Sequence, residues 1–188
     1  MKVYKETVRK YYKYVNWTQP VLTSNTDKNC AVTCSASYNG YPAYYAMDSS
    51  TTNCWFPNTT TGWWKIVFPE EINITALTHI AGAYQGQTQT ITGRYYADSS
   101  KQIPIGNAIS GSYAQGASVQ VQNIPVEGIK TNTIYFEKTA GHANAGIGQL
   151  VITAQEIVES NASNYNTYED VEVYKLPKIN EKYYGIGG

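Results

Sequence analysis

The sequence predicts an all-β fold, an antiparallel sandwich with an extension at each end of the chain. Apolar and polar residues alternate with the period of two that half-buried strands show in four segments: residues 88–97, 117–124, 131–138 and 146–155. Clusters of Gly, Asn, Ser and Pro separate them, as in the SYNGYPA stretch at 37–43. Strands of this length at regular spacing, joined by such loops, are typical of antiparallel sandwiches.

Two more strands are predicted earlier in the chain, at residues 63–68 and 72–81. The Pro69-Glu70-Glu71 stretch between them is a turn signal. Apolar residues on both faces of the second segment place it centrally in the sheet. The one segment that favours a helix is short and spans Glu6 to Tyr14.

Three parts are expected along the chain: an N-terminal extension (1–16), the sandwich (17–155) and a C-terminal arm (156–188). The arm is polar, has no clear periodicity outside Val171 to Val173, and ends in glycines. Such an arm either stays mobile or becomes ordered by docking on a partner. It is therefore expected to attach the sandwich to a larger assembly.

The charge balance argues against nucleic acid as a partner. The chain has 14 Lys and Arg residues and 14 Asp and Glu residues, so its formal net charge is zero, whereas phosphate binding needs clustered cations. The chain is rich in Tyr, with 18 residues, and its other polar residues are mostly neutral. Tyr faces and neutral hydrogen-bonding groups suit contact with carbohydrate or protein, although a β-rich fold by itself also favours Tyr and Thr.

The N-terminal MKVYKETVRKYYKY has no apolar run of signal-peptide length, and no segment approaches the ~20 apolar residues of a membrane span. We therefore expect release into the cytoplasm and no membrane insertion. Three cysteines, Cys30, Cys34 and Cys54, make an odd count without metal-site spacing. Free thiols are expected, with a Cys30–Cys34 bridge formed after release as the alternative.

Catalysis is not expected. The two histidines are His79, inside a predicted strand, and His142, in a Gly-rich loop. No nucleophile motif accompanies either of them. His79 is interpreted as a hydrogen-bonded sheet residue, and His142 as either loop filler or a contact residue.

The order of several short motifs is more specific than a fold class. The chain resembles the discoidin, or coagulation factor five/eight type C, family of galactose-binding-like jelly rolls over about Trp17 to Gln155, through the motifs at 46–48, 52–55, 62–68, 74–80, 95–99, 124–134 and 146–152. The resemblance implies an eight-stranded antiparallel jelly roll without catalytic activity. It also implies that Trp55 and one of Trp63 and Trp64 pack inside, and that loops at one end bind sugars, lipids or proteins.

Loops that would meet at that end supply an aromatic face for the C–H groups of a sugar ring and neutral partners for its hydroxyls. The Phe56 to Thr59 loop tip is expected at the surface. The predicted ligand-binding residues are Tyr41, Phe56, Asn58, Tyr84, Gln85, Gln87, His142 and Asn144.

A structural calcium ion at Asp48 is left as an open alternative to having no cofactor. In sugar-binding members of the family, an Asp and a Glu help to hold calcium. Here Val67 stands where that Asp is common, Gln149 replaces the Glu, and Ser49 replaces a frequent Gly. Fewer carboxylates weaken a calcium site.

The run from Tyr11 to Thr23 resembles a lead-in to discoidin-like modules of bacteriophage virion proteins. The predicted function is therefore a non-catalytic module, present as a homo-oligomer with other virion proteins, that binds host glycans or cell-surface polysaccharide. A head or tail decoration protein without glycan binding, and an extracellular, cell-surface carbohydrate-binding module of bacteria, remain alternatives.

Overall fold

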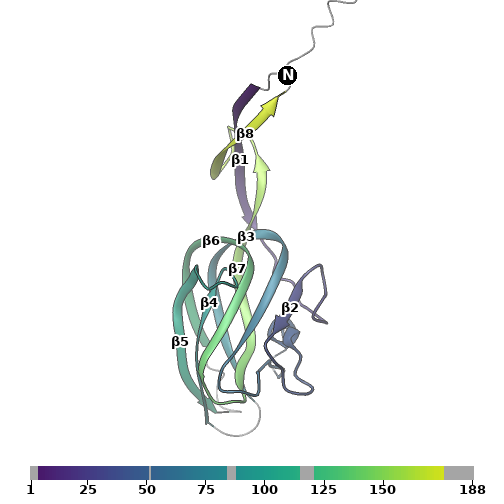
Figure 1. The fold of residues 1–188 in the computed structure, drawn as a ribbon, viewed down its shortest axis with the longest axis vertical. Helices are drawn as coiled ribbons and strands as arrows, with labels where there is room; N and C mark the ends of the chain where they lie inside the picture. The colour runs from purple at the N-terminus through teal and green to yellow at the C-terminus, as the bar shows by residue number, and fades with distance from the viewer. Residues whose placement is uncertain (1–3, 51, 84–87, 115–120, 176–188) are drawn as a thin grey trace, which may run out of the picture. The chain divides into compact units, whose positions relative to one another are not determined.

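The computed structural model describes residues 4–50, 52–83, 88–114 and 121–175, and nearly all of its regular structure is antiparallel strand (Figure 1). The elements are β1 (Tyr4–Asn16), β2 (Ala31–Cys34), the 3₁₀ helix η1 (Ala43–Met47), β3 (Gly62–Ala83), β4 (Thr88–Tyr96), β5 (Pro104–Ala114), β6 (Val121–Gly141), β7 (Ala145–Ser160) and β8 (Thr167–Lys175). Within these ranges, no helix has the length and apolar character needed to cross a membrane. The all-β antiparallel prediction is confirmed.

The chain divides into two compact units. Met1–Tyr14 together with Val158–Gly188 form the first, which we call the ribbon unit, and Val15–Ile157 form the second, the sandwich unit. In the ribbon unit β1 pairs antiparallel with β8. In the sandwich unit the strand order is β5-β4-β6-β3-β7, and β2 pairs with β3.

Two long strands arch from one layer of the sandwich to the other. The start of β3 pairs with the end of β6 (Gly62 with Lys138), whereas the end of β3 pairs with the start of β7 (Ala83 with Ala145). Only residues 142–144 separate β6 from β7, so both ends of β3 must lie at the same end of the sandwich. Figure 1 shows β3 and β6 curving over at the opposite end.

We call these the loop end and the arch end. The bend of β3 falls where its pairing with β6 skips from Val67 to Ile72. Pro69 lies in this bulge, and a proline without an N–H group is tolerated there. Trp17 N donates to Ala154 O (3.3 Å), and Glu156 pairs with Ile72, so the chain enters and leaves the sandwich unit at the arch end.

Four expectations about the elements are wrong. The segments 63–68 and 72–81 form one strand, because the predicted turn at Pro69 is a bulge. The described part of 117–124 likewise continues into 131–138 as β6. Strand β5 lies between the predicted strands at 88–97 and 117–124, where the Gly, Asn and Ser residues of 106–116 predict a connecting loop. Its Gly106 adopts φ +61°, while Ile105 and Ile109 are buried beside β4.

The predicted helix at Glu6 to Tyr14 is a strand. Each residue from Tyr4 to Tyr12 pairs with β8, and the segment is rich in Thr, Val and Tyr, which fit a pleated strand. Pairing with a segment some 160 positions away, as in Arg9 with Asp170, outweighs the local preference. The same pairing orders residues 167–175 of the C-terminal arm, the stretch that includes Val171 and Val173.

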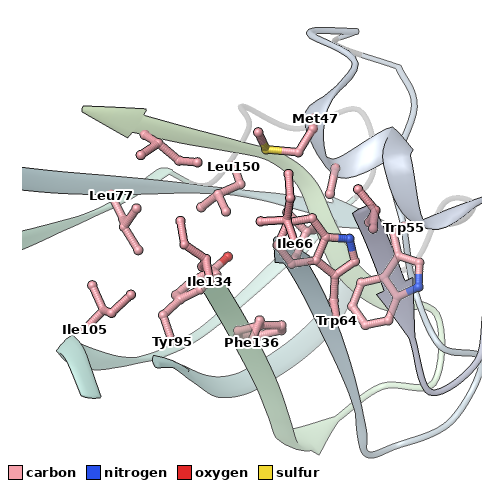
Figure 2. Close-up of a cluster of buried hydrophobic side chains, with 14 of the residues drawn as sticks. Met47, Trp55, Trp64, Ile66, Leu77, Tyr95, Ile105, Ile134, Phe136 and Leu150 are labelled. Carbon is pink, nitrogen blue, oxygen red and sulfur yellow. The ribbon is translucent and has the colours of Figure 1, made fainter. Parts of the chain in front are cut away.

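The core of the sandwich unit confirms the expectation for the tryptophans. Trp55 and Trp64 are both 0% exposed (Figure 2), and their ring nitrogens donate to backbone carbonyl oxygens, Trp55 Nε1 to Ala36 O (3.1 Å) and Trp64 Nε1 to Ala43 O (2.8 Å). Trp63 is half-buried and stacks on Tyr135, 5.8 Å between ring centroids. A buried indole with a partner for its N–H contributes apolar area without an unsatisfied donor.

His79 lies inside the same core. Its Nδ1 is 2.8 Å from Tyr95 Oη, and its Nε2 has no hydrogen-bond partner within the described structure. Burial lowers the pKa of His79 to about 3, so the imidazole is neutral at physiological pH. The three cysteines are unpaired, and burial raises the pKa of the Cys54 thiol to about 12.

Candidate ligand-binding site at the loop end

The loop before β3 packs directly on the start of β7. Trp55 and Ile147 form an antiparallel bridge, with N–O distances of 2.8 and 2.9 Å. A Cβ atom on Gly146 would lie 1.8 Å from Trp55 O and 2.8 Å from Phe56 Cα, so only glycine fits between the two segments. This contact fixes where the loop leaves the core.

Lys138 joins this loop to the β6–β7 turn. The side chain is 1% exposed, and its Nζ donates to Thr59 O (2.8 Å), His142 O (2.6 Å) and Ala145 O (3.0 Å). An ammonium group has three N–H donors, and all three are used. Loss of solvation lowers the pKa of Lys138 to about 8. We call this arrangement the Lys138 clamp.

The sequence interpretation missed the clamp, although a signal was present. Lys138 has the same strand parity as Ile134 and Phe136, which are buried. A lysine on the apolar face of a strand points inward and then needs acceptors.

Three aromatic residues pack against one another in this loop and in the segment at 38–41. Tyr38 stacks on Phe56 with 5.4 Å between ring centroids, Tyr41 lies 4.9 Å from Phe56, and the two tyrosines are 5.9 Å apart. Tyr38 and Tyr41 are half-buried, but Phe56 is 0% exposed. The expectation that Phe56 lies at the surface is therefore wrong, because its ring supports the tyrosines from below.

The β6–β7 turn presents His142 and Asn144. His142 is exposed, its backbone N donates to Thr90 O (2.8 Å), and its Nδ1 accepts from Asn144 N (3.2 Å). Asn58 is exposed and adopts φ +55°. The contacts of Phe56 with Gly146 and of Lys138 with both loops bring Tyr41, Asn58, His142 and Asn144 to the loop end. Tyr84, Gln85 and Gln87 lie outside the described residues.

The segments that connect strand ends here have no formal charge. Residues 35–42, 52–62 and 142–144 include no Asp, Glu, Lys or Arg, although the chain has 14 acidic and 14 basic residues. Lys138 lies beneath them with its ammonium group enclosed by carbonyl oxygens. The loop end therefore offers aromatic faces and neutral hydrogen-bonding groups.

The surroundings of Asp48 do not fit a calcium ion. Its Oδ1 accepts from Gln149 Nε2 (2.9 Å) and Ser50 N (2.9 Å), and its Oδ2 accepts from Asn53 Nδ2 (2.6 Å). Gln149 Nε2 also donates to Tyr45 O (3.2 Å), so an amide NH₂ group lies between the oxygens that would hold a cation. The described residues contain no group of three or more His, Cys, Asp or Glu side chains suited to a metal.

No protein-family model and no curated protein matches the sequence. Solved structures match the fold. A family 32 carbohydrate-binding module of AlyQ, in complex with 4,5-unsaturated mannuronic acid, aligns with a TM-score of 0.50 and 16% identity over 65% of this chain and 92% of that one. A pectin-binding carbohydrate-binding module aligns with a TM-score of 0.50 and 14% identity, over 65% and 88% of the two chains.

A family 89 glycoside hydrolase from Clostridium perfringens aligns with a TM-score of 0.51 and 10% identity, over 67% of this chain and 14% of the enzyme. Some modules with this fold are thus attached to enzymes. At such identities the likeness concerns the fold, and this chain shares the antiparallel jelly-roll fold of family 32 carbohydrate-binding modules.

Proposed function

We propose that the sandwich unit is a non-catalytic module that binds a neutral glycan at the loop end, and that a bacteriophage virion displays it to bind host cells. The observation that carries this proposal is the tyrosine pair on buried Phe56, set among uncharged loops whose backbone is held by the Lys138 clamp. A rigid aromatic face with neutral donors and acceptors around it complements a sugar ring, which has C–H groups on its face and hydroxyls at its edge.

The absence of charge in these segments favours a neutral sugar over a uronic acid. Carboxylates are usually recognised by Arg or Lys side chains that form charge-assisted hydrogen bonds. The sequence of the connecting segments includes no such residue, and the three N–H groups of the buried Lys138 are already used. The AlyQ module was solved with an unsaturated uronic acid, so a different sugar class is proposed for this chain.

A shallow site of this kind gives weak binding per copy. One aromatic face and a few neutral hydrogen bonds correspond to roughly millimolar affinity, about −4 kcal/mol. Display of several copies raises the overall affinity by ~10² to 10⁴. A virion surface supplies such repetition, and the resemblance of Tyr11 to Thr23 to the lead-in of phage modules supports this location.

Binding can be tested with the chain displayed in many copies on beads and probed with neutral and uronate oligosaccharides. His142→Ala should weaken neutral-sugar binding about tenfold without a change in melting temperature. Tyr41→Ala should weaken it as strongly but with a lower melting temperature, because the change uncovers Phe56. Tyr174→Ala, at a 70% exposed position of the ribbon unit, is the matched control.

If no glycan is retained, the decoration role without glycan binding replaces this proposal, and preferential retention of uronates would contradict the neutral class. Mass analysis of the native assembly tests the location. Recovery from a bacterial cell surface instead of a virion would favour the cell-surface alternative.

A further inference from the structure

An asparagine followed by a glycine lies at the tip of a turn at the loop end. The dipeptide Asn39-Gly40 occurs once in the sequence. Tyr41 N donates to Tyr38 O (2.9 Å), so Asn39 and Gly40 are the two central residues of a β-turn. Because Tyr38 N also donates to Phe56 O (3.2 Å), this turn is tied to the loop before β3.

The turn requires the glycine but not the asparagine. Gly40 adopts φ +84°, a conformation that glycine adopts without a steric penalty. The φ angle of Asn39 is not positive, and its exposed side chain has no hydrogen-bond partner in the part of the chain that the structure describes. The fold therefore explains Gly40, whereas it makes no use of the Asn39 amide.

The same geometry leaves two reactive groups side by side and accessible to water. Gly40 is exposed, and apart from its chain neighbours no atom lies within 4 Å of the position that a Cβ atom would take. Among the described residues its N–H has no acceptor. The Asn39 amide can therefore rotate onto an unhindered backbone nitrogen. We propose that Asn39 deamidates spontaneously, and that this reaction converts the neutral loop end into an acidic one.

The reaction needs water as its only co-reactant. The backbone nitrogen of Gly40 loses its proton and forms a bond to Cγ of Asn39, the bond between Cγ and Nδ2 breaks, and the amide nitrogen leaves as ammonia with that proton. Water then opens the succinimide ring. Attack of water at Cγ gives aspartate, and attack at the backbone carbonyl carbon of residue 39 gives isoaspartate. No group is oxidised or reduced.

Either product changes the loop end. A carboxylate appears in a segment that has no formal charge. Isoaspartate also adds one carbon to the main chain between Tyr38 and Tyr41, so the hydrogen bond that closes the turn cannot keep its geometry. The effect on binding rests on the proposed function: a carboxylate beside the tyrosine pair loses part of its hydration when a neutral sugar docks, and this weakens the contact.

The modification is tested by keeping the full-length chain at neutral pH in isotopically labelled water. Peptide mapping by mass spectrometry then measures the label at each asparagine over time. Asn39 should acquire label at least about tenfold faster than Asn58, because Thr59 places a branched Cβ beside the nitrogen that would attack Asn58. Asn58 is a matched internal control, since it is also exposed and lies in the adjoining loop. No label at Asn39, or equal rates at Asn39 and Asn58, overturns the proposal.

The effect on binding is measured with the bead assay, in which each aged chain is compared with its own fresh sample. Asn39→Gln keeps a neutral amide but must close a larger ring, so it should acquire label at least about tenfold more slowly than the wild type. Neutral-sugar retention should fall in the aged wild type in proportion to the modified fraction and stay constant in aged Asn39→Gln. Label at Asn39 with unchanged retention would overturn the effect on binding. A fresh wild type that retains no glycan would contradict the proposed function, whereas the label alone decides whether Asn39 reacts.

Discussion

Protonation of His79 should make the sandwich unit sensitive to acid. The imidazole is 1% exposed, its Nε2 has no partner within the described structure, and burial lowers its pKa from 6.5 to about 3. Between these two pH values the unfolded chain binds a proton that the native chain does not, so stability rises with pH through this window and is lost as the pH falls.

The size of the effect follows from the shift. Each pH unit inside the window changes the free energy of unfolding by about 1.4 kcal/mol. From pH 7 to pH 4 the contribution of His79 is therefore about 3 kcal/mol, a large part of the 5–15 kcal/mol typical of a domain. His79→Asn removes the titration and keeps a polar group near the position of Nδ1.

Urea unfolding at pH 7 and pH 4, followed by tryptophan fluorescence, measures the difference for each variant. Carboxylates contribute equally to both chains, so the Asn variant should lose about 3 kcal/mol less than the wild type between the two pH values. Tyr95→Phe is the matched control, because it removes the hydrogen-bond partner of Nδ1 but leaves the imidazole buried, and it should keep the wild-type pH dependence. Equal losses in wild type and His79→Asn, within 1 kcal/mol, would refute the reasoning.

Three further predictions concern the core, the Asp48 site and the clamp. Trp64→Ala should lower the free energy of unfolding by ~3–5 kcal/mol, and Trp63→Ala should lower it by clearly less, because Trp63 is only half-buried. Equal losses in urea unfolding would contradict the placement of the two side chains. Chelation of calcium should leave the melting temperature of the wild type unchanged. Gln149→Glu places a second carboxylate beside Asp48, so it should lower the melting temperature until calcium is added. A wild type that melts lower with chelator would contradict the hydrogen bonds between Gln149 and Asp48. Lys138→Met leaves three buried carbonyl oxygens without their donor, so it should lower the free energy of unfolding by about 2–4 kcal/mol. Amide hydrogen exchange should become faster in the loop at 52–62. Unchanged stability would show that the clamp is dispensable.

Residue alternation and composition predicted those strands and core segments whose signal lies within a few neighbouring residues. Period-two alternation identified the strand that contains Ile134 and Phe136, and the Trp-rich stretch identified a core segment. The arch was missed because Pro69 signals a turn, and only pairing on both sides shows that the strand continues. The ribbon was missed because β1 acquires its partner from the far end of the chain.

The candidate site was predicted less completely than the fold. Polar loop residues such as Asn58 and His142 are exposed, as their composition suggests, but Phe56 is buried because two tyrosines cover it. Lys138 escaped notice because a charged residue is expected in water. Such contacts join residues that are tens of positions apart, and composition and periodicity do not report them.

The positions at which the backbone enters and leaves the jelly roll have a practical consequence. Trp17 and Ala154 are joined by a backbone hydrogen bond, so the boundaries at Val15 and Ile157 are neighbours in space. A segment whose two termini meet can be spliced into an exposed turn of an unrelated carrier without stretching either partner. Residues 15–157 can therefore be moved as one unit, and a host scaffold could receive the loop end through a single insertion.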